Sequence, residues 1–237
     1  MNIKRILLFL SIISLVVIPL HQAEALVNGG FESGFTGWTT AGDVTIDTSL
    51  FGSGPTAGLQ EARLKTNGPT EQTLSQLQSF FSLPAGTLNG LGNGNVDEGS
   101  AIKQTFAANA GDVLSFDWNF LTRQTTPDVL NDFAYVVLNG QAITLANTHS
   151  TFFPTATTYF HETHFQTYTY NIPTTGNFTL GFSVVDVGIP GNHGRIISAL
   201  ELDNIQLVTP SSPVPEPATV LLLGSSFLGM MGFRRKS

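Results

Sequence analysis

The sequence contains no cysteine, so no disulfide can cross-link the chain and no thiolate can act as a nucleophile or a metal ligand. Charged residues are also scarce, at 11% of the 237 residues. Between residues 26 and 209 there are five lysines and arginines against 15 aspartates and glutamates, a formal net charge of 5 − 15 = −10. Nucleic acids and anionic membranes are bound by basic patches, so this composition argues against both as partners. It favours neutral or cationic partners, or divalent cations.

Short motifs of common hydrolases are missing as well. There is no Gly-x-Ser-x-Gly elbow, and the two histidines of His161-Glu-Thr-His164 lack the His-Glu-x-x-His spacing of zinc proteases. We expect this tetrapeptide in a strand or loop, where positions three apart face opposite sides and do not share a metal. A glycosidase needs two acidic side chains at a defined distance. The sequence does not determine the distances between its candidate acids, which are Asp112, Asp117, Asp128 and Asp132. We therefore predict that the protein is not an enzyme.

Long apolar runs occur only near the two ends of the chain. At the start, Lys4 and Arg5 precede an apolar segment, residues 6–20, and the small-residue site Ala23-Glu24-Ala25 follows. Basic, apolar and small residues in this order are typical of a secretory signal peptide. We predict that residues 1–25 are cleaved off after export. An uncleaved signal anchor is the alternative.

The last 23 residues combine three elements in a fixed order. Pro215-Glu216-Pro217 precedes 16 residues without a charged side chain, Ala218 to Phe233, and the chain then ends with Arg234, Arg235, Lys236 and Ser237. A helix of that length rises about 24 Å, less than the roughly 30 Å hydrocarbon core, so it would be a weak transmembrane anchor. The basic residues at its end place the C-terminus in the cytoplasm by the positive-inside rule.

This tail resembles the PEP-CTERM sorting signal of Gram-negative bacteria. The resemblance implies that an exosortase, a membrane protease, cuts the chain beside the Pro-Glu-Pro box after brief insertion in the inner membrane. The released protein would pass to the cell surface or extracellular matrix, where exopolysaccharide is an expected partner. We thus expect a linker at residues 210–217, a transmembrane segment at 218–233 and a cytoplasmic tail at 234–237. An ordinary single-pass anchor is the alternative.

The remaining segment, residues 26–209, has the length of one domain and the pattern of β structure. Short apolar or alternating runs are separated by turn sequences, of which Asn139-Gly140 is the clearest hairpin signal. The expected strands are residues 43–47, 59–64, 101–106, 113–120, 133–138, 141–145, 165–170, 178–185 and 200–207. Many short strands at this spacing predict an all-β fold, a jelly-roll β-sandwich.

One short helix is expected to interrupt the strands. Thr70 can cap it, Pro84 ends it, and apolar residues recur at helical spacing: Leu74, Leu77 and Phe81. It could cover an open part of a sheet or act as a mobile lid. Residues 89–99 follow as a loop of glycine, asparagine and acids without EF-hand spacing, so we expect a plain surface loop, with calcium binding as the alternative.

The two ends of this domain resemble galactose-binding-like jelly rolls, the fold of many carbohydrate-binding modules. Leu26-Val-Asn-Gly-Gly-Phe-Glu32 resembles their opening, and Leu202-Asp203-Asn204-Ile205 resembles their closing strand. The resemblance implies that Glu32 and Asp203 meet on neighbouring strands and hold a structural calcium together with backbone carbonyls. Hard oxygen ligands are those that calcium prefers. The alternative is that both are polar groups at strand ends.

Aromatic rings are the natural candidates for sugar binding, because a ring face and directional hydrogen bonds together recognise a sugar. We name Trp38, Tyr159 and Tyr168 as glycan-binding candidates, and residues 148–164, rich in Thr, Phe and His, as the candidate binding loop. Trp118 alternates with other aromatic residues of an expected strand, so we assign it to the core.

The preferred function is an exported, non-catalytic cell-surface or matrix protein that is sorted by an exosortase and mixes with exopolysaccharide. The alternatives are a calcium-stabilised, lectin-like glycan-binding module and, less favoured, a carbohydrate-active enzyme. Solvent-exposed aromatic rings around a shallow face would favour the glycan-binding module. Paired carboxylates in a cleft would favour the enzyme.

Overall fold

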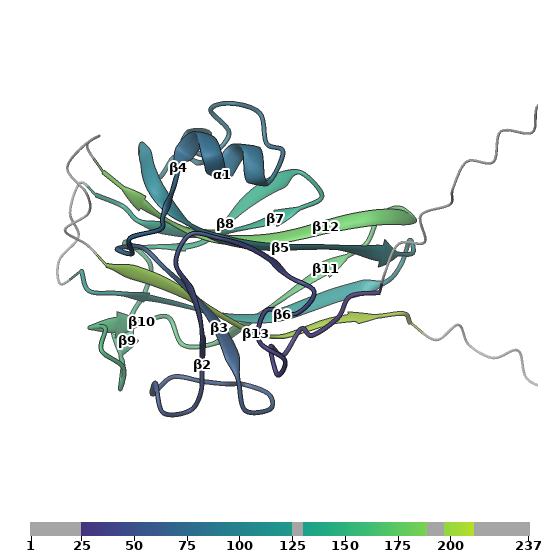
Figure 1. Ribbon diagram of the computed structural model, residues 1–237, viewed down its shortest axis with the longest axis horizontal. Coiled ribbons are helices and arrows are strands. Elements are labelled where there is room, and N and C mark those ends of the chain that lie inside the picture. Colours follow the sequence, from purple (N-terminus) through teal and green to yellow (C-terminus); the bar gives the residue numbers. More distant parts are fainter. Residues whose placement is uncertain (1–24, 125–129, 189–196, 211–237) are drawn as a thin grey trace, which may run out of the picture.

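The computed structural model describes residues 25–124, 130–188 and 197–210. Two antiparallel sheets pack face to face over one core, and a short helix lies on the outside of one sheet (Figure 1). This arrangement confirms the predicted all-β sandwich with one inserted helix. The predicted signal peptide, the sorting box and the apolar tail lie outside the described residues. Within the described ranges, no helix is long and apolar enough to cross a membrane.

The first sheet has the strand order β1-β5-β12-β7-β8, and β4 also pairs with β5. Its strands are β1 (Thr39–Ala41), β4 (Gln72–Thr73), β5 (Val96–Ala108), β7 (Phe133–Leu138), β8 (Gln141–Asn147) and β12 (Gly176–Val187). The second sheet has the order β2-β3-β13-β6-β10-β9, and β11 also pairs with β6. Its strands are β2 (Val44–Asp47), β3 (Glu61–Lys65), β6 (Val113–Thr122), β9 (Phe153–Pro154), β10 (His161–Glu162), β11 (Gln166–Asn171) and β13 (Ser198–Val208).

All the strands expected from the sequence are present; residues 133–138 have the expected bounds, and the other strands have shifted ends. Asn139-Gly140 joins β7 to β8, and both residues have the positive φ, 48° and 86°, that a tight hairpin turn requires. The short strands β1, β4 and β9 were not expected, whereas β10 lies in the tetrapeptide that was expected in a strand or loop. Residues 89–99 were wrongly predicted as a loop throughout: Asn89–Leu91 is a 3-10 helix, and β5 already begins at Val96.

The core lies between the sheets and follows the alternation of the strands. On β6, Phe116, Trp118 and Phe120 point inward and are at most 6% exposed, which confirms the assignment of Trp118 to the core. Residues of β12 and β7 meet them from the other sheet, including Phe182, whose ring centroid lies 4.7 Å from that of Phe116. Burial of these large rings is the main source of stability in a chain without disulfides.

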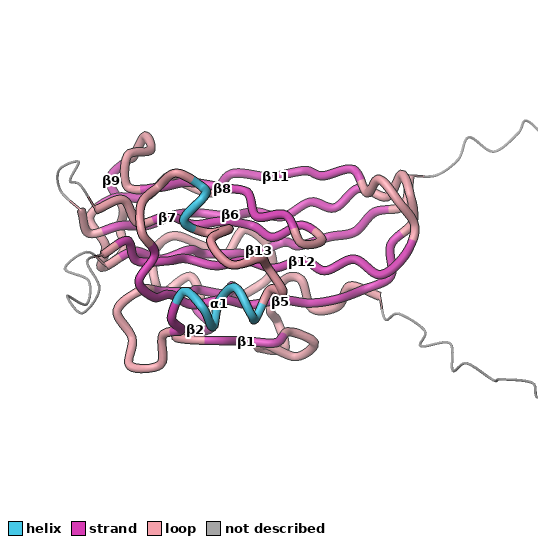
Figure 2. The backbone as a smooth tube through the Cα atoms, turned by 90° about the horizontal axis from the view of Figure 1, so that it is seen from above, coloured by secondary structure: helices cyan, strands magenta, loops and turns pink. Residues whose placement is uncertain are grey.

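Helix α1 (Leu74–Phe80) covers part of the outer face of the first sheet, as the cyan coil of Figure 2 shows. Leu77 and Phe81 are buried against Tyr135 and its neighbours on β7, so the helix is a packed cover of the sheet. Thr73, not Thr70, caps it, because Gln76 stands three residues later and its Oε1 accepts the Thr73 backbone N–H at 2.8 Å.

Candidate functional site

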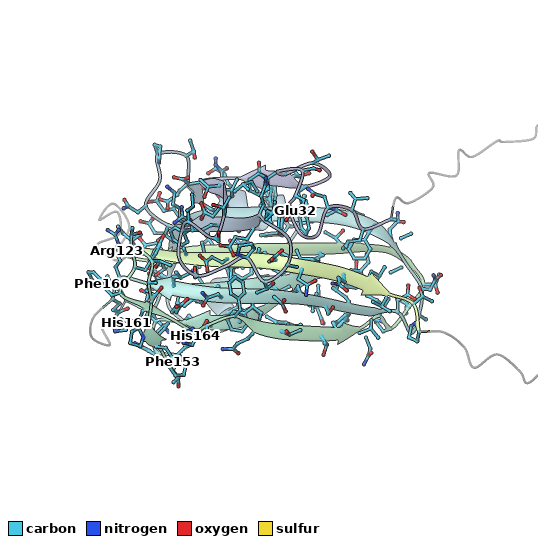
Figure 3. All side chains as sticks on the ribbon, turned by 90° about the horizontal axis from the view of Figure 1, so that it is seen from below. Glu32, Arg123, Phe153, Phe160, His161 and His164 are labelled. Carbon is cyan, nitrogen blue, oxygen red and sulfur yellow. The ribbon has the colours of Figure 1, made fainter. Side chains whose placement is uncertain are left out.

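The candidate binding loop, residues 148–164, forms one end of the sandwich. Strand β10 lies at the Thr122 end of β6, since His161 pairs with Thr122, and β9 pairs with β10. The backbone N–H of Phe160 donates to the Thr122 carbonyl at 3.1 Å and fixes the preceding turn to the same strand. Five side chains gather at this end in Figure 3, and we call them the end patch: Arg123, Phe153, Phe160, His161 and His164.

The end patch exposes aromatic rings. Phe153 is 45% and Phe160 52% exposed, and the side chain of His164 is 57% exposed. The Phe153 and His164 rings stack at 26°, with centroids 4.7 Å apart. Two stacked, solvent-exposed rings thus stand at this end, and exposed aromatic rings are the feature that the sequence analysis associated with a glycan-binding module.

A buried carboxyl group contacts one ring of this stack. His164 Nδ1 lies 3.5 Å from Glu162 Oε1, and Glu162 is only 6% exposed. The other oxygen of Glu162 accepts a 2.7 Å hydrogen bond from Asn119 Nδ2 on β6. His164 also has a left-handed backbone, φ 57°. The Glu162 contact and the backbone conformation therefore orient the ring, and more than half of the side chain stays exposed.

The aromatic residues named from the sequence serve mainly for packing. Trp38 is 7% exposed, and its Nε1 donates to the Asn28 carbonyl at 3.1 Å. Tyr159 is 6% exposed and packs edge-on against Phe51. Tyr168 is half-buried and stacks on a core ring. Their burial does not favour the prediction that they bind glycans.

Sequence reasoning missed Phe153 and Phe160 as exposed aromatic residues, although it named the loop that carries them. The sequence did contain a signal of their exposure. Both phenylalanines stand in a polar stretch rich in threonine and histidine, and Pro154 limits the strand that Phe153 can join.

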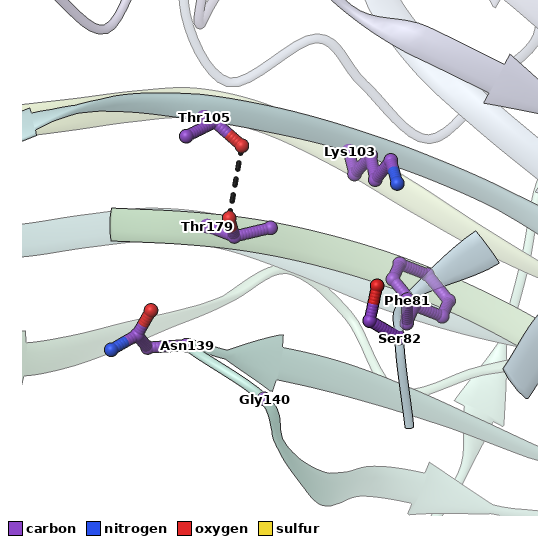
Figure 4. Close-up of a pocket in the computed structure, with 7 residues that line it drawn as sticks. All are labelled: Phe81, Ser82, Lys103, Thr105, Asn139, Gly140 and Thr179. Atoms are coloured by element: carbon purple, nitrogen blue, oxygen red, sulfur yellow. Dashed lines mark hydrogen bonds between the residues drawn. The ribbon is translucent and has the colours of Figure 1, made fainter. Parts of the chain in front are cut away.

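A second surface feature is a pocket of about 420 Å³ on the outer face of the first sheet, beside the end of α1 (Figure 4). Its lining comes from four separate segments: Phe81, Ser82, Lys103, Thr105, Asn139, Gly140 and Thr179. The Thr105 and Thr179 hydroxyls hydrogen-bond to each other at 2.9 Å across β5 and β12. The pocket thus combines hydroxyls, an amide, an ammonium group and one aromatic edge.

Glu32 and Asp203 act on the same surface loop. Glu32 Oε1 accepts the backbone N–H groups of Leu59 and Gln60 at 2.6 and 2.9 Å. Asp203 Oδ2 accepts those of Thr56 and Ala57, both at 2.7 Å. The two carboxylates therefore anchor one short stretch of backbone and already have hydrogen-bond donors. Calcium at this position stays a prediction, and Figure 3 shows Glu32 well away from the end patch.

Buried carboxyl groups line the outer side of the second sheet under the same loop. Burial, then the charge of Glu201 and other nearby acids, raises the pKa of Glu61 to about 9. Burial likewise raises the pKa of Glu201 to about 7, against hydrogen bonds from Ser53 and Asn119. Burial also raises the pKa of Asp203 above its usual range. Glu61 and Glu201 therefore hold protons at a pH where surface acids are ionised.

The acids considered for catalysis have structural partners in the described chain. Asp117 accepts from the Thr167 hydroxyl at 2.6 Å, and Asp112 accepts the Asn109 backbone N–H at 2.7 Å. Asp132 is fully buried and accepts from the Ser198 hydroxyl at 2.8 Å. Asp128 lies outside the described residues. His161 is in strand β10, as expected, and its Nδ1 lies 3.0 Å from the Gln124 carbonyl.

No group of three or more histidine, aspartate or glutamate side chains in the described ranges is arranged to hold a metal ion. The described part of the chain is a β-sandwich that carries an aromatic end patch and a polar pocket on its surface.

A family model adds what lies beyond the sandwich. Residues 213–236 match the PEP-CTERM protein-sorting motif, which confirms the prediction made from Pro215-Glu216-Pro217 and the basic end. The motif implies export, transient membrane anchoring and processing by an exosortase, a membrane protein.

Several of the solved structures that are similar to this chain are carbohydrate-binding modules. The module TmCBM61 in complex with β-1,4-galactotriose is 14% identical with a TM-score of 0.42, covering 79% of this chain and 99% of its own. The N-terminal cellulose-binding domain of Cellulomonas fimi β-1,4-glucanase C is 17% identical with a TM-score of 0.35, covering 81% and 100%. The CBM22-1 xylan-binding domain from Paenibacillus barcinonensis is 13% identical with a TM-score of 0.34, covering 78% and 94%. Among curated proteins, no match was found.

Proposed function

We propose that this protein is an exported, non-catalytic glycan-binding protein that an exosortase releases to the cell surface or extracellular matrix of a Gram-negative-type bacterium. The sorting motif supports the route. The observation that carries the binding role is the exposed Phe153–His164 stack at one end of the sandwich. Exopolysaccharide is the proposed partner.

The position of the end patch supports this role. Along β6 and β13, Ser198 pairs with Thr122 at the end-patch side, and Val208 pairs with Val113 at the other end. Residues 25 and 210, where the described chain begins and ends, lie together at that other end (Figure 1). A chain tethered by its C-terminal tail would therefore present the end patch away from the membrane.

The chemistry of the end patch fits a sugar. The flat faces of Phe153 and His164 offer contact to the C–H side of a pyranose ring, and Phe160 extends the apolar surface. Directional hydrogen bonds would come from His161 and from the exposed Arg123. The Arg123 Nε donates to the Thr158 carbonyl, and among the described residues its other N–H groups have no hydrogen-bond acceptor.

A glycan-array screen of the full chain, purified in a mild detergent, tests the proposal. We expect binding to neutral polysaccharides, with roughly a threefold to tenfold loss of affinity on Phe153→Ala, since one aromatic contact contributes about 0.5–1.5 kcal/mol. His164→Asn should act similarly, because asparagine tolerates the left-handed backbone but has no ring.

Leu59→Ala is the matched control, because it removes a 75% exposed apolar side chain outside the end patch and should leave binding unchanged. No binding on the array, or equal binding by the Phe153 and Leu59 variants, would overturn the glycan role of the end patch. The sorting route would then stand alone, as that of a structural matrix protein.

Structural calcium at Glu32 and Asp203 is a further part of the proposal. Both carboxylates hold the loop at residues 56–60, so backbone carbonyls of that loop are the expected additional ligands. Calcium would stabilise the loop beyond its present hydrogen bonds.

A further inference from the structure

The pocket on the first sheet exists because α1 covers only part of the outer face. Phe81, at the end of the helix, packs directly over Gly181 of β12, where a Cβ atom would come within 2.2 Å of its ring. Beyond Phe81, the outward-facing residues Thr105 and Ala107 of β5 are exposed. Lys103 pairs with Gly181 and Thr105 with Thr179 in the β5–β12 register, so these side chains stand side by side on the uncovered face.

Lys103 is held in a fixed position at this pocket. Its Nζ donates a hydrogen bond to the Phe80 backbone carbonyl and lies 4.5 Å from the centroid of the Phe80 ring. An ammonium group has three N–H donors, so two remain for a ligand. The aromatic ring and the carbonyl orient the cation without neutralising it.

The charge of the pocket is unusual for this chain. No aspartate or glutamate lines it, although acids outnumber basic residues 15 to five between residues 26 and 209. Two of the other basic residues are neutralised: Arg63 pairs with Asp47 at 2.7 Å and Lys65 with Asp43 at 3.4 Å. Lys103 has no ion-pair partner within the described ranges.

We propose that this pocket binds a carboxylate-bearing sugar unit, a uronate, of an acidic glycan. The Lys103 ammonium group donates a charge-assisted hydrogen bond to the carboxylate. The sugar hydroxyls form hydrogen bonds with the Asn139 amide, the Ser82 hydroxyl and the Thr105–Thr179 pair. A volume of about 420 Å³ is within the usual range of small-ligand sites, roughly 300–1,000 Å³. The inference rests on the proposed function only in taking a glycan as the ligand.

The pocket and the end patch are separate surfaces. The pocket includes Asn139, which follows the end of β7 and whose N–H donates to the Thr179 carbonyl, near the start of β12. The end patch lies on the second sheet at the Thr122 end of β6. One molecule can therefore hold two glycan chains, or two parts of one chain, which increases the apparent affinity for a polysaccharide.

Titration calorimetry of the full chain in mild detergent with polygalacturonate oligosaccharides, and with their methyl esters, tests the pocket. The ester keeps every hydroxyl and removes the charge. We expect the acid to bind about tenfold more tightly or better, and Lys103→Gln to reduce this binding to the level of the ester. Lys103→Arg, which keeps the positive charge, should retain the preference for the acid.

Two further variants separate the outcomes. Asn139→Gly preserves the left-handed turn, so weaker binding of both acid and ester would assign the amide to the sugar hydroxyls. Lys65→Gln removes a lysine elsewhere and should change nothing. Equal affinity for acid and ester, or unchanged acid binding in Lys103→Gln, would overturn the proposal. Because Phe153→Ala should leave the preference for the acid intact, failure of the end patch and failure of the pocket are distinguishable.

Discussion

Glu61 is an acidic residue of the second sheet whose burial is energetically costly. It is fully buried, and neither carboxyl oxygen has a hydrogen-bond partner in the described chain. Gly54 lies so close that a Cβ atom there would sit 1.9 Å from Glu61 Oε2. Charges of Glu201 and Asp47 add to the effect of burial, so the neutral, protonated form of Glu61 is the stable one in the fold.

We predict that the protein becomes less stable as the pH rises, because Glu61 loses this proton. Glu61 has an ordinary pKa of 4.5 and a folded pKa of about 9, so between these values the folded state holds a proton that the unfolded state has released. Its contribution is intact below about pH 4.5 and is lost progressively up to pH 9. Melting temperature measured across this range should fall less steeply in Glu61→Gln, which carries no proton to lose.

Glu201→Gln provides the comparison. The pKa of Glu201 is raised only to about 7, so this variant should flatten the pH dependence below that value. Because the charge of Glu201 also raises the pKa of Glu61, the alkaline part of the curve should remain but shift to lower pH. If the Glu61→Gln curve runs parallel to that of the unmodified protein from pH 5 to 9, the buried proton is not at Glu61.

The proposed binding of calcium at Glu32 and Asp203 can be tested with single-residue variants. Asp203→Ala removes an acceptor from two backbone N–H groups and from the Thr56 hydroxyl, which should cost about 1–3 kcal/mol in any buffer. A structural calcium would add a loss seen only when calcium is present. Melting of the variant and the unmodified protein, in calcium and in chelator, separates the two terms. An identical difference in both buffers would argue against calcium, and Glu32→Ala serves as the second carboxylate variant.

Individual residues were predictable where a strand pattern determines their environment. The alternation of Phe116, Trp118 and Phe120 was enough to assign all three to the core. Trp38 and Tyr159 stand in turns or loops, where no period tells whether a ring faces inward. Trp38 packs against Phe31 and Tyr159 against Phe51, and no strand or helix periodicity in the sequence links either pair.

At the scale of elements, helix α1 and strand β12 depend on each other through one glycine. We predict that Gly181→Ala destabilises the protein by about 1–3 kcal/mol, because the new methyl group would meet the Phe81 ring within 2.8 Å at two atoms and displace it. Denaturant unfolding measures this loss. Gly90→Ala is the matched control, since a Cβ atom there meets nothing within 4 Å. Equal stability of the two variants would show that α1 shifts freely.

Element length decided what the sequence could predict. Strands such as β6 and β12 are long enough to show their own alternation, whereas β4, β9 and β10 each contain two residues and exist only because a partner strand is present. The same is true of the helix start, where pairing of residues 72–73 with β5 moves the cap from Thr70 to Thr73.

At the scale of the whole molecule, the C-terminal motif should decide the destination. Deletion of Pro215–Ser237 is predicted to give an exported protein that bypasses membrane anchoring, because the apolar segment and its basic end are gone. Glu216→Ala alone keeps that segment, so the chain should stay in the membrane fraction without being processed. Fractionation and the apparent mass on a gel check both results. Unchanged retention and processing after the deletion would contradict the sorting prediction.

The architecture was predictable as a class, but the pocket was not. A sandwich follows from short strands, turn residues and a chain of suitable length. The pocket joins residues 81–82, 103–105, 139–140 and 179, and no local pattern links these four segments. They meet because β5, β12 and β7 are neighbours, an order that depends on the complete set of strand pairings.

The placement of both ends of the described chain opposite the end patch also determines how the molecule would respond to pulling. A polysaccharide held at His161 and a tether leaving beyond Val208 would load β6 and β13 along their length, from Ser198–Thr122 to Val208–Val113. Hydrogen bonds between the strands lie across that direction, so they would be sheared together instead of being opened one after another. We expect this geometry to resist tension in flowing water better than a protein gripped across its sheets.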